Sequence, residues 1–144
     1  MQPLNVLLVE DNPGDADLTR ETLEAGERLL DISVVVDGEQ AMDFLLSRHP
    51  FARVPTPDLI VLDLNLPRMN GREVLAAIKT HDRLRIIPIV ILTSSDAERD
   101  IVESYALGAN CYVTKPLGLV AFQAVVTTIK TFWFTVVQLP GPGR

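Results

Sequence analysis

The chain has 144 residues, of which 47% are hydrophobic, and its formal net charge is −6. This length suits one domain with a single core, and the apolar content is too high for a disordered chain. An acidic chain without a cluster of lysine and arginine is a poor candidate for direct binding of nucleic acid. Acidic residues gather near the N-terminus, so a divalent cation or a basic partner fits that end better; they are Glu10, Asp11, Asp15, Asp17, Glu21 and Glu24.

Cellular location is addressed by three features. A single cysteine, Cys111, excludes an internal disulfide and fits a reducing compartment, so we expect a cytoplasmic protein. The N-terminus has no basic region and too short an apolar run for a signal peptide. Residues 118–139 are long and apolar enough for a membrane span, but glutamines and threonines interrupt them. We therefore expect the last helix of a globular domain there, and no membrane segment.

Five short runs rich in valine, isoleucine and leucine predict strands at residues 4–9, 32–36, 59–62, 87–92 and 111–113. Each run is almost continuously apolar, which is typical of parallel strands covered by helices on both faces. Between them lie helical signals such as Asn12-Pro13, a cap residue followed by proline, and Ser95-x-x-Glu98, a capping-box pattern. The alternation predicts an α/β fold within residues 1–139, followed by a frayed tail at residues 140–144.

Polar residues follow four of these five runs. Because the carboxyl ends of parallel strands meet at one edge, where ligands bind in such sheets, we expect their side chains to converge. They are Glu10 and Asp11 after the first run, Asp63 and Asn65 after the third, Thr93 after the fourth and Lys115 after the fifth.

The converging residue types suit phosphoryl chemistry. Clustered carboxylates repel one another unless a cation joins them, and a set of oxygen ligands suits Mg²⁺. The carboxylate of Asp63 can attack phosphorus to form an acyl phosphate. Lys115 and Mg²⁺ would stabilise charge on the phosphoryl oxygens, and the Thr93 hydroxyl can donate to one of them. Taken alone, each residue also suits an ordinary helix start, strand end or surface, and only their joint placement favours a site.

Four motifs in order resemble the receiver domain of bacterial two-component response regulators. They are VEDNPGD (residues 9–15), LDLNLPRMNG (62–71), ILTSS (91–95) and TKP (114–116), and the resemblance spans residues 4–134. The resemblance implies a flavodoxin-like (βα)5 fold, doubly wound, whose five-stranded parallel sheet has the order 2-1-3-4-5 with helices on both faces.

The resemblance also implies a role for each site residue. Asp63 matches the residue that accepts a phosphoryl group from a phosphohistidine on a sensor histidine kinase. Glu10 and Asp11 match the acidic pair that holds Mg²⁺, with Asp63 and the backbone carbonyl of Asn65 as further ligands.

Three further positions match the family's switch. Thr93 matches the hydroxyl that moves toward the phosphoryl group, and Tyr112 matches the aromatic residue that turns inward when it does. Lys115 matches the lysine that contacts the phosphoryl group, and its peptide bond to Pro116 is expected to be cis.

The resemblance narrows further to stand-alone receivers that pair with bacterial phytochrome kinases, through the segments DNPGD, NCYVTKP and FWFTVVQLP. We expect no output domain and signalling by protein–protein contacts. Apolar residues surround more than one face of the last helix, which predicts a homodimer through this region unless the tail covers it. They are Phe122, Val125, Val126, Ile129, Phe132, Trp133, Phe134, Val136 and Val137.

Two other functions deserve comparison. Asp63-Leu64-Asn65 superficially resembles the DxD motif of phosphoaspartate phosphatases, which would make the protein a hydrolase of small phosphoesters. That class needs an acid two residues after its nucleophile, and Asn65 cannot donate a proton to a leaving group. A flavodoxin-like electron carrier would need a phosphate-binding loop and flanking aromatic residues, which the sequence lacks.

Overall fold

A five-stranded parallel sheet forms the centre of the computed structural model, which describes residues 2–140. The strand order is β2-β1-β3-β4-β5, so the predicted flavodoxin-like topology is confirmed. Each predicted strand is present, with ends displaced by at most two residues. The strands are β1 (Leu4–Val9), β2 (Leu30–Val35), β3 (Leu59–Leu62), β4 (Ile89–Thr93) and β5 (Cys111–Thr114).

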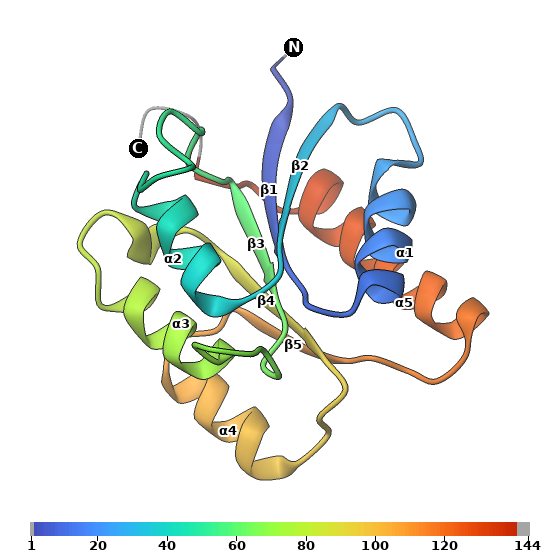
Figure 1. Cartoon of the computed structure of the whole chain (residues 1–144). Helices are drawn as coiled ribbons and strands as arrows, with labels where there is room; N and C mark the ends of the chain where they lie inside the picture. Colours follow the sequence, from blue (N-terminus) through green and yellow to red (C-terminus); the bar gives the residue numbers. More distant parts are fainter. Residues whose placement is uncertain (1, 141–144) are drawn as a thin grey trace.

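Helices cover both faces of the sheet (Figure 1). On one face lie α1 (Pro13–Glu24) and α5 (Leu119–Thr131), and on the other lie α2 (Gly38–Leu45), α3 (Gly71–Lys79) and α4 (Glu98–Ala106). Two short pieces complete the described part of the chain: the 3₁₀ helix η1 (Leu84–Ile86) and the π-helix η2 (Phe132–Val136), which continues α5. Residues 141–144 of the predicted tail lie outside the described residues.

The core has two layers because successive strand residues point to opposite faces. On β1, Leu7 and Val9 pack with α2 and α3, whereas Val6 and Leu8 pack with α1 and α5. All four are at most 2% exposed. This burial on both faces is the physical reason why the strands read as continuous apolar runs in the sequence.

The starts of the helices were predicted with mixed success. Asn12 caps α1, as expected, by accepting a hydrogen bond from the backbone N–H of Asp15 at 3.0 Å. The capping box predicted at Ser95 is wrong, because α4 begins at Glu98 after Ala97 and has no side-chain cap. The hydroxyl of Ser95 donates instead to Asp100 at 2.5 Å, since a carboxylate is the stronger acceptor.

A capping box does occur at the start of α3. Asn70 accepts from the backbone N–H of Glu73 at 3.0 Å, and the Glu73 side chain accepts from the N–H of Asn70 at 3.1 Å. Asn70 thereby satisfies two backbone donors that the helix start leaves without intrahelical partners. The reciprocal pair fixes the entry of the chain into α3, close behind Asp63.

The expectation of a cis bond between Lys115 and Pro116 is wrong. Among the described residues, the cis peptide bond lies between His49 and Pro50. Bonds before proline prefer the trans form by only about 0.5–1 kcal/mol, so local packing decides the isomer at each one.

The segment Leu119–Val136 is long and apolar enough to cross a membrane by length and composition, and 22% of it is buried within the chain. Its inner side packs on the sheet through Phe122, Val126 and Ile129. Lys130 also fastens the helix to the end of α1 by donating to the carbonyl of Ala25 at 2.5 Å. Such packing is that of a helix covering a sheet, and it leaves the outer side of the segment apolar and uncovered.

A first prediction concerns Gly71, because its Cα faces the backbone of the strand end that carries Asp63. A Cβ at this position would lie 2.2 Å from the carbonyl oxygen of Asp63 and 2.6 Å from the Cα of Leu64. Gly71→Ala is therefore expected to lower the free energy of unfolding in urea by about 1–3 kcal/mol, as overpacking does. Gly14→Ala is the control, because its Cβ would meet only Asn12 Oδ1 at 3.4 Å. Equal stability of the two variants would contradict the prediction.

Candidate functional site

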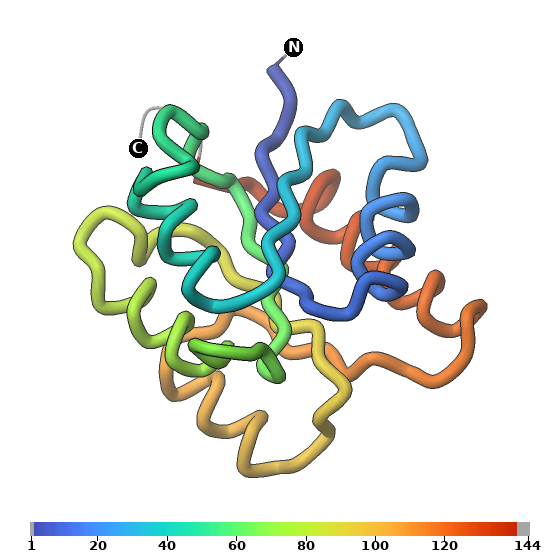
Figure 2. The backbone as a smooth tube through the Cα atoms, in the orientation of Figure 1, coloured from blue at the N-terminus to red at the C-terminus, as the bar shows by residue number. Residues whose placement is uncertain are grey.

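The predicted polar residues meet at the carboxyl edge of the sheet. The chain enters β1 from the N-terminus, so these strand ends lie at the far end of the sheet in Figure 2. Glu10 directly follows β1 and its N–H donates to the carbonyl of Val35 at 3.0 Å. Asp63 directly follows β3 and its N–H donates to the carbonyl of Val9 at 3.1 Å. Sheet-type hydrogen bonds thus hold both carboxyl-bearing residues in place.

Lys115 joins the strand ends together. Its backbone N–H donates to the carbonyl of Thr93 at 2.7 Å, which continues the pairing of β4 with β5. Its ammonium nitrogen lies 2.6 Å from Glu10 Oε1, 2.9 Å from Asp63 Oδ2 and 2.9 Å from Asp15 Oδ2. The side chain of Lys115 is only 6% exposed. A buried lysine with three carboxylate neighbours stays protonated, because these contacts outweigh the burial that opposes its charge and raise its pKa.

Asp63 is held ready in its charged form. Burial alone would disfavour the carboxylate, but hydrogen bonds from Lys115 and from the backbone N–H of Asn65, the latter at 3.1 Å, more than compensate. The pKa of Asp63 therefore lies below its ordinary value. A carboxylate that stays ionised and is fixed at both oxygens is available as a nucleophile.

Glu10 has the opposite electrostatic situation. Burial, aided by repulsion from Asp63, raises the pKa of Glu10 to about 7, although Lys115 opposes the rise. One lysine therefore does not neutralise the buried carboxylates. Two carboxyl groups in one site have been driven apart in pKa, a pattern common at functional sites.

The acidic residues fit a divalent cation. One oxygen each from Glu10, Asp11 and Asp63 lies within 4.8 Å of the others. These are hard oxygen donors, and their surplus negative charge is the charge that a cation such as Mg²⁺ or Mn²⁺ would balance. Asp11 is exposed, so the set opens to solvent, and an ion would keep water molecules among its ligands. Asn65 is also exposed at the rim of this set.

Thr93 contributes a buried hydroxyl without a partner. Its side chain is 0% exposed, and Oγ1 has no hydrogen-bond partner among the described residues. The hydroxyl is near enough to Asp63 to help lower the pKa of that carboxyl, so its effect is electrostatic and lacks the geometry of a formed hydrogen bond. An unsatisfied buried hydroxyl costs about 1–3 kcal/mol, which acceptor oxygens added to Asp63 would relieve.

Tyr112 lies farther along β5 and faces the loop after β4. Its hydroxyl donates to the carbonyl of Ser95 at 2.8 Å, and its ring packs against the core layer of α2 and α3. The Tyr112 side chain is thus turned inward in this structure. It contacts the same loop, two residues beyond Thr93, which would let a movement of that loop reach the tyrosine.

One site residue was missed by sequence reasoning. Asp15 lies in the first turn of α1, yet its carboxylate contacts Lys115 at a separation of 100 residues along the chain. An acid at a helix start has a sufficient local explanation in the helix dipole. The spacing of four residues from Asp11, which places both on one side of the chain as it enters α1, was the available signal.

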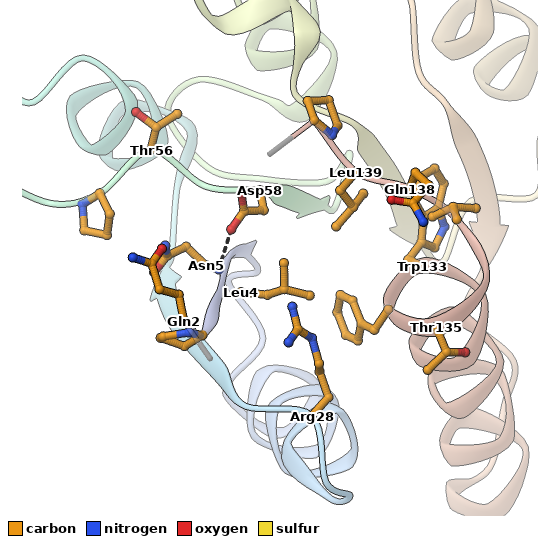
Figure 3. Close-up of a pocket in the computed structure, with 15 residues that line it drawn as sticks. Gln2, Leu4, Asn5, Arg28, Thr56, Asp58, Trp133, Thr135, Gln138 and Leu139 are labelled. Carbon is orange, nitrogen blue, oxygen red and sulfur yellow. Dashed lines mark hydrogen bonds between the residues drawn. The ribbon is translucent and has the colours of Figure 1, made fainter. Parts of the chain in front are cut away.

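A larger hollow lies at the opposite end of the sheet. It has a volume of about 640 Å³ and is bordered by Asn5, Asp58, Trp133 and Gln138, among others (Figure 3). Asp58 is engaged there, since it accepts a hydrogen bond from the N–H of Asn5 at 2.9 Å. This hollow is remote from the carboxylates and Lys115, so it takes no part in the site at the carboxyl edge.

The fold and this set of strand-end residues define a phosphoryl-accepting signalling domain. Residues 6–127 match the response regulator receiver domain, and the chain belongs to this family. Receiver domains work with sensor histidine kinases.

Named relatives agree with this assignment. The chain is 43% identical over 138 residues to the response regulator Rcp1 of Synechocystis sp., covering 96% of this chain and 94% of Rcp1. It also resembles the phosphorylated cyanobacterial phytochrome response regulator RcpA, with a TM-score of 0.94, 41% identity and coverage of 97% of this chain and 100% of RcpA. The Mn²⁺-bound structure of Rcp1 has a TM-score of 0.94 at 42% identity, covering 96% of this chain and 100% of that one.

A second prediction follows from the raised pKa of Glu10. In metal-free buffer, the folded protein holds the Glu10 proton up to pH about 7, whereas the unfolded chain releases it near 4.5. The contribution to stability is complete below pH 4.5 and is lost as the pH rises through 7, by up to about 3 kcal/mol. Glu10→Gln should therefore flatten the fall in unfolding free energy between pH 5 and 8.

Urea denaturation at several pH values, with a chelator present, measures this effect. The exposed residue Glu27 provides the control, since Glu27→Gln should leave the slope of the wild type unchanged. Asp63 does not confuse the result, because its lowered pKa places its titration below this pH window. A Glu10→Gln protein with the same pH dependence as wild type would refute the assigned titration.

Proposed function

We propose that Asp63 accepts a phosphoryl group from a phosphohistidine of a sensor histidine kinase, in a reaction that requires Mg²⁺. The observation that carries the proposal is the buried contact between Asp63 and Lys115, beside the carboxylates of Glu10 and Asp11 and the unpartnered hydroxyl of Thr93. Every group that phosphoryl transfer needs is thereby within one site.

The reaction is a simple displacement at phosphorus. An oxygen of Asp63 forms a bond to phosphorus while the bond from phosphorus to the imidazole nitrogen breaks, and the electron pair stays on that nitrogen. Lys115 is placed to donate to a phosphoryl oxygen, and the hydroxyl of Thr93 to another. Later attack by water breaks the bond between phosphorus and Asp63, which restores the carboxylate and releases inorganic phosphate. Lys115 and Thr93 thus assist a phosphoacceptor that acts as a signalling protein.

The residues assigned to Mg²⁺ are Glu10, Asp11 and Asp63, with the backbone carbonyl of Asn65. Support comes from the closeness of the three carboxylates and from their excess of negative charge over the single Lys115. A bound Mg²⁺ would neutralise charge on the phosphoryl oxygens. The Mn²⁺-bound form of Rcp1 gives further support for a divalent ion in this kind of site.

The signal would leave the site through Thr93 and Tyr112. Movement of the Thr93 hydroxyl toward the phosphoryl group would shift the loop after β4, whose Ser95 carbonyl accepts the hydrogen bond of Tyr112. Tyr112 and the exposed neighbouring surface of α4 would then present a changed face to a partner. Val102 and Tyr105, which are 59% and 50% exposed, belong to that surface.

The proposed upstream partner is a bacterial phytochrome kinase in the cytoplasm. It is supported by the similarity to Rcp1 and to RcpA, the latter a cyanobacterial phytochrome response regulator. We also propose that the chain acts as one receiver domain over residues 1–139 and signals by protein contact, since all described elements belong to the sheet and its covering helices. No role in binding nucleic acid is proposed, given the net charge of −6.

The third prediction tests the phosphoacceptor. Incubation with acetyl phosphate and Mg²⁺ should add the mass of one phosphate to the wild-type protein, and chelation of Mg²⁺ should prevent the addition. Asp63→Asn should abolish it, because an amide is not a nucleophile of comparable strength. Asp82→Asn, which removes an exposed acid between α3 and η1, should behave as wild type. Sustained release of phosphate from small phosphoesters, without a phosphorylated protein, would favour the phosphatase alternative.

We further propose a homodimer through the C-terminal helix region. The buried members of the predicted apolar set face the sheet, whereas Phe132 and Val136 on η2 are 47% and 64% exposed. Two apolar side chains four residues apart on a five-residue helix lie on one side of it, and burial of such a patch against a second copy is favourable.

The fourth prediction tests this dimer by light scattering during gel filtration. The wild-type protein should elute with twice the mass of one chain, and Phe132→Glu should reduce it to a single mass because a charge would be buried in the contact. Val102→Glu places the same charge on an exposed apolar position of α4 and should leave the dimer intact. A monomeric wild-type protein at high concentration, with and without phosphorylation, would overturn the proposal.

A further inference from the structure

We propose that Asp15 is a positioning residue that restrains Lys115 and thereby weakens the hold of the site on a phosphoryl group at Asp63. This inference rests on the proposed phosphorylation of Asp63. The expected purpose of the restraint is a phosphorylated state of limited stability, as a reversible signal requires.

The first support is the complete use of the Lys115 ammonium group. An ammonium group has three protons to donate, and three carboxylates lie within hydrogen-bonding distance of it. Two of them, Glu10 at 2.6 Å and Asp63 at 2.9 Å, belong to the core of the site. The third is Asp15, also at 2.9 Å. A phosphoryl oxygen that seeks a proton from Lys115 must therefore replace a carboxylate already bound to it.

The second support is the rigid placement of Asp15. Its backbone N–H is held by the side chain of Asn12 at 3.0 Å, and Pro13 begins the helix just before it. The carboxylate is thus presented from the capped first turn of α1. Its side chain is 33% exposed, whereas those of Glu10 and Asp63 are 2% and 6% exposed. Asp15 approaches Lys115 from the solvent side of the site.

The third support is the division of tasks among the acids. The carboxylates grouped closely enough for one cation are Glu10, Asp11 and Asp63, and Asp15 is not among them in the described part of the chain. A cation would draw on oxygens of Glu10 and Asp63 that now face Lys115. The contact from Asp15 would persist, so in the loaded site Asp15 becomes the main competitor for Lys115.

The charges determine the direction of the effect. Phosphorylation replaces the single negative charge of Asp63 by about −1.5 to −2 on the phosphoryl group. Asp15 adds a like charge nearby and withholds part of the only ammonium group in contact with Asp63. Both effects disfavour the phosphorylated state. Removing the charge of Asp15 should therefore strengthen the binding of a phosphoryl group, the reverse of what loss of a supporting contact would do.

The fifth prediction uses beryllofluoride, which binds to a carboxylate as a phosphoryl analogue without any bond-breaking step. With Mg²⁺ held constant, calorimetry should show that Asp15→Asn binds beryllofluoride about three- to tenfold more tightly than wild type, as expected for loss of one partly exposed charge. Asp15→Ser should show the same gain. Asp15→Glu keeps the charge and should stay near the wild-type affinity.

Asp17→Asn is the matched control, because Asp17 lies two residues along α1, is exposed and makes no printed contact with Lys115. Its affinity should equal that of wild type. Equal tightening by Asp17→Asn, or unchanged or weaker binding by Asp15→Asn, would overturn the inference. A wild-type protein that binds beryllofluoride and gains phosphate, while Asp15→Asn does not differ from it, refutes the inference alone. A wild-type protein that does neither refutes the proposed function itself.

Discussion

The contact of one buried ammonium group with three carboxylates is the constraint on which the rest of the site depends. Lys115 would be costly to bury alone, and so would Glu10 and Asp63. Together they tolerate burial because each supplies the counter-charge that the others lack. The contact also joins the ends of β1, β3 and β5 to the start of α1 through Asp15, so the charges that serve phosphoryl chemistry also hold together elements distant in the chain.

The balance of these charges is deliberately incomplete in its consequences for binding. One lysine leaves negative charge over, which appears as a pKa of about 7 at Glu10 and as a low pKa at Asp63. A divalent cation and an anionic phosphoryl group would each find a complementary charge here: the first among the carboxylates, the second at Lys115. Metal binding and phosphorylation are therefore expected to favour one another.

Much of the fold and site was predictable because the topology does the work. Continuous apolar runs indicate parallel strands, and the carboxyl ends of such strands meet, so Glu10, Asp63 and Lys115 had to lie close together. Asp15 was not predictable in the same way, because it lies inside a helix and its direction depends on how α1 packs. Ser95 misled for a related reason: its hydroxyl bonds to Asp100 rather than to the helix start that the local pattern suggested.

The unpartnered hydroxyl of Thr93 has a consequence for how such a protein can evolve. Replacing this buried group by an apolar one of the same shape, as in valine, would remove an unsatisfied donor and so favour the folded resting state. The same replacement would remove the group that is to sense the phosphoryl oxygens. Selection for thermal robustness and selection for responsiveness therefore oppose one another at position 93, and the retained threonine marks responsiveness as the stronger demand.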